Sequence, residues 1–336
     1  MEMKDDKVIE DFLSKINHWG QQGIPFFFVI DFEMKHPLAY ELSSMDPKEM
    51  LFEINGFSNA PDSVKEGFHK ETILKNEIIR KHPIQPEAYN QKFNKVYERL
   101  AYGDSFLTNL TIDTEIHLSH SLKEIFFMCE AKYKLWFKDN FIVFSPETFV
   151  KIEEGKIYSN PMKGTIDASI PDAESKILND RKELAEHITI VDLIRNDLSQ
   201  VAKDVRVERF RYVEEVRTNT KTLLQVSSEI AGELNGDYSS HLGDILVTLL
   251  PAGSVSGAPK PKTLEIIRDV ETKDRGYYTG VFGYFDGMKL DSGVMIRFIE
   301  KRQNGYFYRS GGGITTQSSS HAEYQEAIDK VYVPVN

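Results

Sequence analysis

A lysine in a turn-like pentapeptide is the residue of this chain best suited to do chemistry. Residues 161–165 read Pro-Met-Lys-Gly-Thr, and Lys163 follows Glu147 by sixteen residues. Pro161 fixes φ and Gly164 frees the backbone, so the pentapeptide predicts a strand end or a turn rather than a helix interior. A lysine aimed from such a turn into a closed pocket can lose its proton and act as a nucleophile. Lys163 is therefore either a candidate nucleophile or a solvated lysine beside a loop proline.

Two pairs of glutamates have the spacing of one helix face. Glu183 and Glu186 are three residues apart, as are Glu323 and Glu326, and Lys330 follows four residues later. Residues at i and i+3 share a face of a helix, so two such helices could hold a hard cation between them. Magnesium prefers one or two carboxylates together with waters and an anionic substrate. The alternative is that both pairs lie on solvated helix faces with ordinary ion pairs.

Two glycine-rich segments and one arginine are candidates for binding an anion. The segment 251–263 leads into a predicted helix at Pro261 or just after, and its free amides could cradle an anion. Gly311, Gly312 and Gly313 end a predicted strand and would let a carboxylate approach the backbone closely. Arg297 alternates with apolar residues, which predicts a strand-borne guanidinium suited to a carboxylate.

The elements that must position these side chains follow from hydrophobic periodicity and from helix start and stop signals. We expect helices over 5–18, 86–102, 122–137, 172–200 and 321–333, and strands within 25–32, 38–42, 50–54, 107–118, 140–159, 221–231 and 278–309. No fixed repeat and no low-complexity linker divides the chain. We therefore predict a short N-terminal extension, residues 1–84, that contributes strands to the same fold as a catalytic domain at 85–336.

Composition excludes several classes of protein. The chain has 336 residues, 40% of them hydrophobic, and a formal net charge of -11, which argues against a nucleic-acid footprint. A single cysteine, Cys129, excludes an internal disulfide and a cysteine-ligated zinc site, and fits a reducing, cytoplasmic setting. The apolar run at 24–30 is too short to cross a bilayer, so we expect no membrane association.

Several of these segments resemble the chorismate-utilising enzymes, a family that includes anthranilate, aminodeoxychorismate, isochorismate and salicylate synthases. The matching segments are 145–147, 161–165, 182–198, 253–267, 275–286, 294–297, 310–315 and 322–330. They follow the family order from about residue 86 to 333. The resemblance implies an α+β fold with four layers, α/β/β/α, in which two mainly antiparallel sheets pack together with the active site between them.

The resemblance also implies a role for each candidate. Glu147 matches the acid–base carboxylate, and Glu186 and Glu326 match ligands of Mg²⁺, with Glu183, Glu323 and Lys330 as supporting residues. Tyr278, Arg297 and the amides of Gly311 and Gly313 match the binders of the substrate's side-chain carboxylate, and Gly164 and Thr165 lie beside the ring carboxylate.

Position 163 distinguishes members of the family. Most have alanine there, whereas aminodeoxychorismate synthases component I often have lysine, so Lys163 implies amination of chorismate through a lysine-linked intermediate for p-aminobenzoate and folate. Ammonia would come from a separate glutamine amidotransferase. The alternatives are an anthranilate synthase component I-like enzyme and a chorismate-binding paralogue without turnover.

Two positions depart from the family pattern. Leu107 stands where water-using members have a lysine, and leucine cannot activate water as a base. Amine-using members usually have glutamine at that position. Gln225 replaces the inner histidine of the family, as it does in some amine-using relatives.

Overall fold

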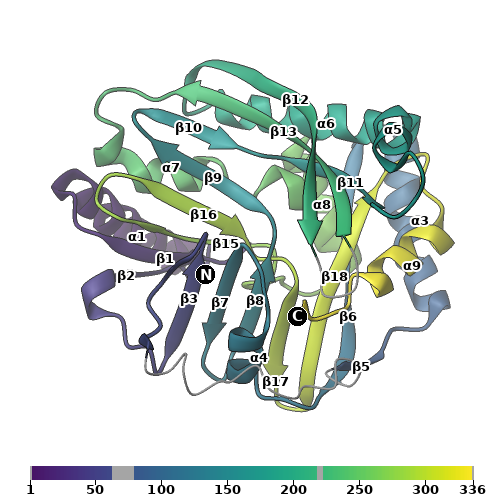
Figure 1. Cartoon of the computed structure of the whole chain (residues 1–336), viewed down its shortest axis with the longest axis horizontal. Coiled ribbons are helices and arrows are strands. Elements are labelled where there is room, and N and C mark those ends of the chain that lie inside the picture. Colours follow the sequence, from purple (N-terminus) through teal and green to yellow (C-terminus); the bar gives the residue numbers. More distant parts are fainter. Residues whose placement is uncertain (1, 63–78, 218–221, 335–336) are drawn as a thin grey trace.

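The computed structural model describes residues 2–62, 79–217 and 222–334. Within these ranges two large antiparallel sheets pack together, and helices cover their outer faces (Figure 1). This confirms the predicted α+β fold with mainly antiparallel sheets.

The first sheet is flanked by the N-terminal helix and by helices from the middle of the chain. Its strands run in the order β11 (Met162–Asp167), β13 (Thr222–Glu233), β10 (Lys156–Ser159), β9 (Thr148–Glu153), β16 (Leu290–Val294), β15 (Val281–Phe285), β1 (Phe26–Ile30) and β2 (Leu38–Glu41), and β12 (Lys203–Arg217) also pairs with β13. The helices on this side are α1 (Glu2–Gln22), α5 (Ala173–Asn179), α6 (Arg181–Leu198) and α7 (Leu242–Thr248).

The second sheet has its own set of helices. Its strands run in the order β14 (Gly257–Ala258), β6 (Leu107–Leu118), β18 (Gly305–Ile314), β17 (Phe298–Arg302), β8 (Phe141–Ser145), β7 (Tyr133–Phe137), β3 (Met50–Ile54) and β4 (Phe57–Ser58), and β5 (Ile79–His82) pairs with β6. The helices are α3 (Pro86–Tyr102), α4 (Leu122–Met128), α8 (Lys260–Glu271) and α9 (Ser320–Asp329).

Strands buried on both faces hold the four layers together. Successive side chains of a strand point to opposite faces of its sheet. In β1, Phe26 and Phe28 pack into the cluster under α1, while Phe27 packs into the cluster shared with the second sheet. In β8, Val143 faces the first sheet and Phe144 faces α4. Each such strand therefore contributes to two hydrophobic cores.

Two predicted helices differ from the structure. The prediction over 122–137 is wrong in its second half, because α4 ends at Met128 and β7 follows. The Lys134 ammonium donates to the carbonyls of Phe126 and Cys129 at the end of α4, and it pairs with Glu53 at 3.0 Å. An apolar run such as 133–137 fits a buried strand as well as a buried helix.

The predicted helix over 172–200 is divided at Asp180. Asp180 has extended backbone angles, and its carboxylate accepts from the amide of Glu183 at 3.0 Å, which caps α6. The strand β12 was not predicted, because its charged residues break the apolar alternation on which such predictions rest. The last helix ends at Asp329, four residues before the predicted end.

The N-terminal part of the chain is built into both sheets. β1 and β2 pair in the first sheet, and β3 and β4 pair in the second. The boundary proposed near residue 84 stays a prediction.

Among the helices in the described ranges, none has the length and apolar character needed to cross a membrane.

Candidate active site

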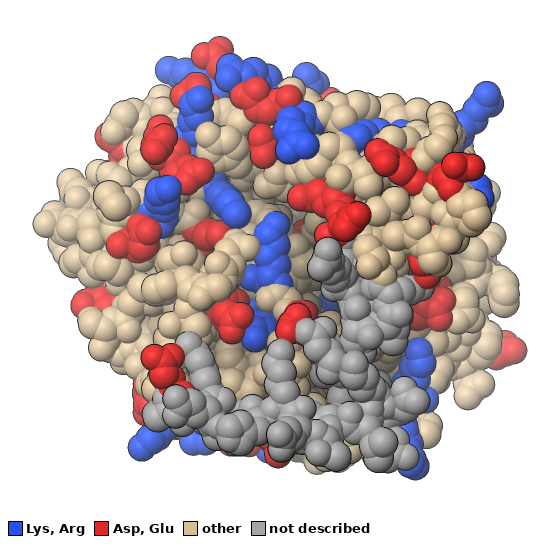
Figure 2. Space-filling view, in the orientation of Figure 1, with Lys and Arg blue, Asp and Glu red and all other residues tan. Residues whose placement is uncertain are grey.

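A large cavity lies where the two sheets meet and where α6 and α9 approach them. Its volume is about 860 Å³, and every site residue predicted from the sequence lines it. These residues are Glu147, Lys163, Gly164, Thr165, Glu183, Glu186, Tyr278, Arg297, Gly311, Gly313, Glu323, Glu326 and Lys330. Figure 2 shows acidic and basic side chains mixed over the face seen in Figure 1. The cavity is also lined by both acidic and basic side chains, so the net negative charge of the chain does not predict the charge of the cavity.

Lys163 is aimed by an irregularity in β11. Met162 pairs with Ser227 and Thr165 pairs with Gln225, so the register shifts between them. Gly164, inside this bulge, has φ of 87°. A bulge turns side chains away from the regular alternation and is common beside active sites. The predicted strand end is thus the bulged start of β11. The half-buried Lys163 lies in this bulge and faces the cavity.

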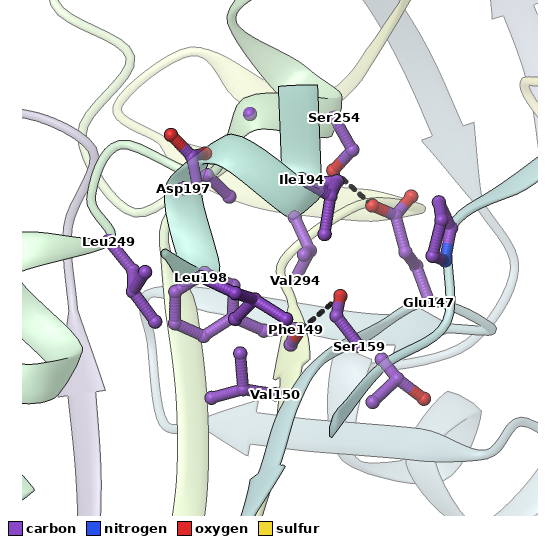
Figure 3. A pocket seen from close by; sticks show the side chains of 14 residues that line it. Glu147, Phe149, Val150, Ser159, Ile194, Asp197, Leu198, Leu249, Ser254 and Val294 are labelled. Carbon is purple, nitrogen blue, oxygen red and sulfur yellow. Dashed lines mark hydrogen bonds between the residues drawn. The ribbon is translucent and has the colours of Figure 1, made fainter. Parts of the chain in front are cut away.

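Glu147 lies where the chain crosses from one sheet to the other. It stands between β8 of the second sheet and β9 of the first, and its carbonyl accepts from the amide of Val294 at 3.1 Å. The hydroxyl of Ser254 donates to Oε1 of Glu147 (Figure 3). Burial raises the pKa of the Glu147 carboxyl, while Ser254 and the positive charge of Lys163 oppose the rise. A carboxyl with a raised pKa is suited to give and take a proton near neutral pH.

Arg297 lies at a second crossing between the sheets, and the prediction that it is on a strand is wrong. β16 ends at Val294 and β17 begins at Phe298, so Arg297 occupies the link between them. Its φ is 55°, and Thr279 on the same cavity wall has φ of 62°. Such left-handed backbone costs on the order of 1–3 kcal/mol for each residue and tends to occur at functional sites.

The guanidinium of Arg297 borders the cavity beside an aromatic cluster. Its Cζ lies 5.2 Å from the ring centre of Tyr332, and its Nε is buried without a hydrogen-bond partner. Nearby, Cζ of Arg309 lies 5.0 Å from the ring centre of Tyr278, which is almost fully buried. Arg309 is already paired with Asp113 at 2.8 Å, so Arg297 is the better placed of the two guanidiniums to receive a carboxylate.

The acidic residues of α6 and α9 face the glycines of both sheets. A Cβ at Gly164 would lie 3.1 Å from Oε2 of Glu183, and one at Gly312 would lie 3.4 Å from Oε2 of Glu323 and 3.5 Å from Oε1 of Glu326. A side chain at position 164 would therefore crowd Glu183, whereas a Cβ at position 312 would only touch the two carboxylates of α9.

Lys330 is a basic residue that contacts the glutamates of α9. Its Nζ lies 2.6 Å from Oε1 of Glu326 and donates to the carbonyl of Gly311 at 2.9 Å. Burial lowers the pKa of Lys330, and the Glu326 carboxylate opposes the change. Lys330 thus links the end of α9 to the glycine-rich end of β18.

Glu186 and Glu326 both line the cavity, and carboxylate oxygens are the ligand type that Mg²⁺ prefers. Two carboxylates with remaining positions for water and substrate are enough for Mg²⁺. Within the described ranges no three His, Cys, Asp or Glu side chains gather as a complete protein cage for a metal. An ion held here would therefore depend on water and an anionic substrate for its other ligands.

The two positions that depart from the family pattern have different surroundings. Leu107 is buried, is absent from the cavity lining of the described chain and lies under Gly313, where a Cβ would be 3.3 Å from its Cδ1. Gln225 lies on β13 opposite Thr165 and does line the cavity. An amide therefore faces the cavity at position 225.

Sequence reasoning missed several residues that line the cavity. The main ones are Asn109, Ser254, Arg309 and Tyr332. Arg309 lies two residues before the first glycine of the run 311–313, and this position was a usable signal. Tyr332 had none, because it follows the end of α9 in a tail whose course depends on packing against α4.

A two-sheet fold thus surrounds a cavity that is lined by a lysine, a buried carboxyl with a raised pKa and the acidic residues of two helices. The chorismate binding enzyme family matches residues 52–336, so the chain belongs to that family.

Individual relatives fall at two levels of similarity. A Haemophilus influenzae protein bearing the name "Uncharacterized PabA-like protein" is 47% identical over 97% of this chain and 97% of its own length. Aminodeoxychorismate synthase component 1 of Escherichia coli is 31% identical, over 73% of this chain and 56% of that protein. Among solved structures, anthranilate synthase component I of Streptococcus pneumoniae has a TM-score of 0.65 at 27% identity, over 77% of this chain and 60% of that one. The chain thus spans little more than half of the named synthase components.

Proposed function

We propose that this protein is an aminodeoxychorismate synthase component I, which converts chorismate and ammonia to 4-amino-4-deoxychorismate and water. The observation that carries the proposal is the amine of Lys163, turned by the β11 bulge into a cavity that Glu147 also lines. Family membership supports chorismate as the substrate. The product would serve p-aminobenzoate and folate synthesis.

The chain's own residues account for both halves of the reaction. The neutral amine of Lys163 forms a bond to C2 of chorismate, the ring double bonds shift, and the C4–O bond breaks. Glu147 gives its proton to the departing hydroxyl, which leaves as water, and then takes a proton from the new secondary amine. Ammonia forms a bond to C4, the double bonds shift back, and the C2–N bond to Lys163 breaks. A proton from the ammonia nitrogen returns through Glu147, so that Lys163 leaves as an amine.

Binding residues orient the substrate for this attack. Arg297 and Tyr278, with Gly311 and Gly313, would hold the side-chain carboxylate, and Gly164 and Thr165 would border the ring carboxylate. Glu186 and Glu326 would hold Mg²⁺, with Glu183, Glu323 and Lys330 around them. When bound, the ion supplies positive charge that neutralises the ring carboxylate.

A separate glutamine amidotransferase would supply the ammonia. The chain has one cysteine, and Cys129 is 1% exposed. Burial raises the pKa of its thiol to about 12, so Cys129 is unsuited to act as the thiolate of a glutaminase. A partner subunit is therefore part of the proposal.

The test is product analysis with the purified chain. We expect chorismate, magnesium chloride and ammonium chloride to give 4-amino-4-deoxychorismate, identified by chromatography against an authentic standard. Glutamine should replace ammonium only when a cognate amidotransferase is added. Anthranilate as the product would favour the anthranilate synthase alternative, isochorismate would show that water is the nucleophile, and chorismate binding without turnover would indicate a non-catalytic paralogue.

A further inference from the structure

A second, much smaller pocket lies behind Glu147. Its volume is about 20 Å³, enough for one molecule of the size of water or ammonia. Glu147 and Ser254 line both this pocket and the large cavity, so they form the partition between the two. Figure 3 shows these two residues and Ser159 on one side of the pocket and Asp197 on the other.

The walls of the small pocket are mostly hydrocarbon. They come from β9, α6, β16 and the segment 249–254 that follows α7. The apolar side chains are Phe149, Val150, Pro161, Ile194, Leu198, Leu249, Ala252 and Val294. Asp197 at the margin is already paired with the ammonium of Lys260 at 3.0 Å. A small neutral molecule is therefore favoured over a free ion in this pocket.

The hydroxyl groups that line the pocket already donate their hydrogen bonds to other groups of the protein. Ser159 donates to the carbonyl of Phe149 at 3.0 Å, and Ser254 donates to Oε1 of Glu147. Thr148 lies 2.8 Å from the Tyr133 hydroxyl, whose own proton goes to Asp291, so Thr148 must be the donor. These hydroxyls therefore offer a guest only lone pairs.

A guest that mainly donates hydrogen bonds matches such a pocket. Ammonia has three N–H donors and a single lone pair, whereas water has two donors and two lone pairs. A buried acceptor without a donor costs on the order of 1–3 kcal/mol, so water would be less well satisfied here than ammonia.

We propose that the small pocket behind Glu147 binds ammonia and holds it next to the partition before it attacks C4. This inference rests on the proposed amination of chorismate. From the pocket, ammonia reaches the large cavity past Glu147 and Ser254. As the N–C4 bond forms and the C2–N bond breaks, Glu147 gives its proton to the departing amine of Lys163 and takes one from the nitrogen that is now bound to C4.

The test is to fill the pocket without touching the substrate cavity. Ala252→Val adds two carbons to a residue that lines the small pocket and not the large one. Ala39→Val on β2 adds the same two carbons to the same hydrophobic core, away from both. Steady-state rates are measured with ammonium chloride varied at saturating chorismate, and with chorismate varied at saturating ammonium.

We expect Ala252→Val to raise KM for ammonium about tenfold or more, with KM for chorismate unchanged, because a filled pocket excludes its guest. Ala39→Val should change neither constant. If Ala252→Val does not fold, Val150→Ile adds one carbon to the same pocket and should raise KM for ammonium in the same way.

Three outcomes would overturn the inference. A folded pocket variant with unchanged KM for ammonium overturns the pocket alone, since the enzyme would still aminate chorismate. Equal increases in both constants would indicate damage to the whole site and would likewise overturn it. A wild-type enzyme that does not aminate chorismate overturns the proposed function, and the ammonia pocket with it.

Discussion

Ser254 donates a hydrogen bond from its hydroxyl to Oε1 of Glu147, and so joins the turn at residues 253–255 to the link between β8 and β9. The two residues are 107 positions apart in the chain. This contact favours the charged form of Glu147, whereas burial of the carboxyl favours the neutral form. The balance between them decides the pH at which Glu147 gives up its proton.

The first prediction follows from that balance. Ser254→Ala removes a hydrogen bond to the charged carboxylate, so the pKa of Glu147 should rise further above its ordinary value. The limb of the kcat profile that reports loss of the Glu147 proton should then move to higher pH. The measurement is kcat from pH 5 to pH 9 with both substrates saturating. Ser119→Ala, at an exposed serine far along the chain, serves as the control. If this limb of the kcat profile lies at the same pH in Ser254→Ala and in the wild type, Ser254 does not influence the acid–base step.

The second prediction concerns the nucleophile. Lys163→Ala removes the amine that is proposed to attack C2, so formation of 4-amino-4-deoxychorismate should fall by about a hundredfold or more. Residual amination should shift toward C2, because ammonia would then meet the unprotected carbon. Wild-type protein incubated with chorismate and magnesium, without ammonia, should show a covalent adduct on Lys163 by mass spectrometry.

Lys156→Ala is a matched control for that experiment. Lys156 lies on β10, which is separated from β11 by β13 in the same sheet, and it forms a surface ion pair with Glu233 at 3.5 Å. It should retain full activity. Full amination at C4 by Lys163→Ala would rule out the covalent route.

The third prediction concerns the metal. Glu186→Gln and Glu326→Gln each remove a charged oxygen ligand from the proposed Mg²⁺ site, so each should abolish turnover while the circular dichroism spectrum is retained. Glu265→Gln, which breaks a surface ion pair with Lys262, should have no effect. Activity that survives an excess of chelator would show that no metal takes part.

The fourth prediction uses a histidine behind the nucleophile strand. His187 on α6 is 0% exposed and hydrogen-bonded to Ser228 at 2.7 Å. Burial lowers the pKa of His187 to about 4, and the positive charge of Arg211 lowers it too. The unfolded chain has an ordinary histidine pKa and therefore binds more protons between about pH 6.5 and pH 4. Stability from this group is fully present above about pH 6.5 and is lost as the pH falls toward 4.

The loss should amount to about 3 kcal/mol in the free energy of unfolding. Urea denaturation at pH 7, 6, 5 and 4 measures it. His187→Gln cannot titrate in this range, so its stability should decline less steeply than that of the wild type. Parallel declines for the two proteins would show that carboxylates, and not His187, set the acid limit.

Much of the site was predictable because its chemistry is carried by short segments. Lys163 and the two glutamate pairs were candidates from residue types and spacing, and the family resemblance added Glu147; the structure places all of them around one cavity. Helix periodicity alone predicts that Glu183 and Glu186 lie on the same face of a helix. Short segments of sequence therefore indicated which groups line the cavity.

What the sequence did not predict depends on long-range packing. Arg297 was expected on a strand, but the chain leaves the first sheet after Val294 and takes a left-handed turn before β17. The residues 133–137 were expected in a helix, but β3 and β8 flank them as a strand. Ser254 meets Glu147 only because the sheets and α6 bring distant segments together. Alternation and propensity do not encode such partners.

The last prediction concerns Tyr332, at the edge of the cavity. The chain leaves α9 at Asp329, and Val331 and Val333 anchor the tail in the cluster under α4. The Tyr308 hydroxyl donates to the carbonyl of Tyr332 at 3.1 Å, which holds the ring over Arg297. Such a cation–π contact at a partly exposed site contributes about 0.5–1 kcal/mol. Tyr332 therefore acts as a positioning residue for the guanidinium.

Tyr332→Ala should raise KM for chorismate about two- to fivefold with kcat unchanged, because Arg297 would be less well placed to receive a carboxylate. Tyr332→Phe keeps the ring and loses only the hydroxyl that contacts Arg297, so its KM should lie between those of the wild type and Tyr332→Ala. Tyr102→Ala, at a tyrosine that is 85% exposed at the end of α3, controls for the loss of a surface aromatic residue. If KM for chorismate is the same in Tyr332→Ala and the wild type, the ring covers Arg297 without orienting it. If kcat falls while KM holds, Tyr332 contributes to the chemical step and not to binding.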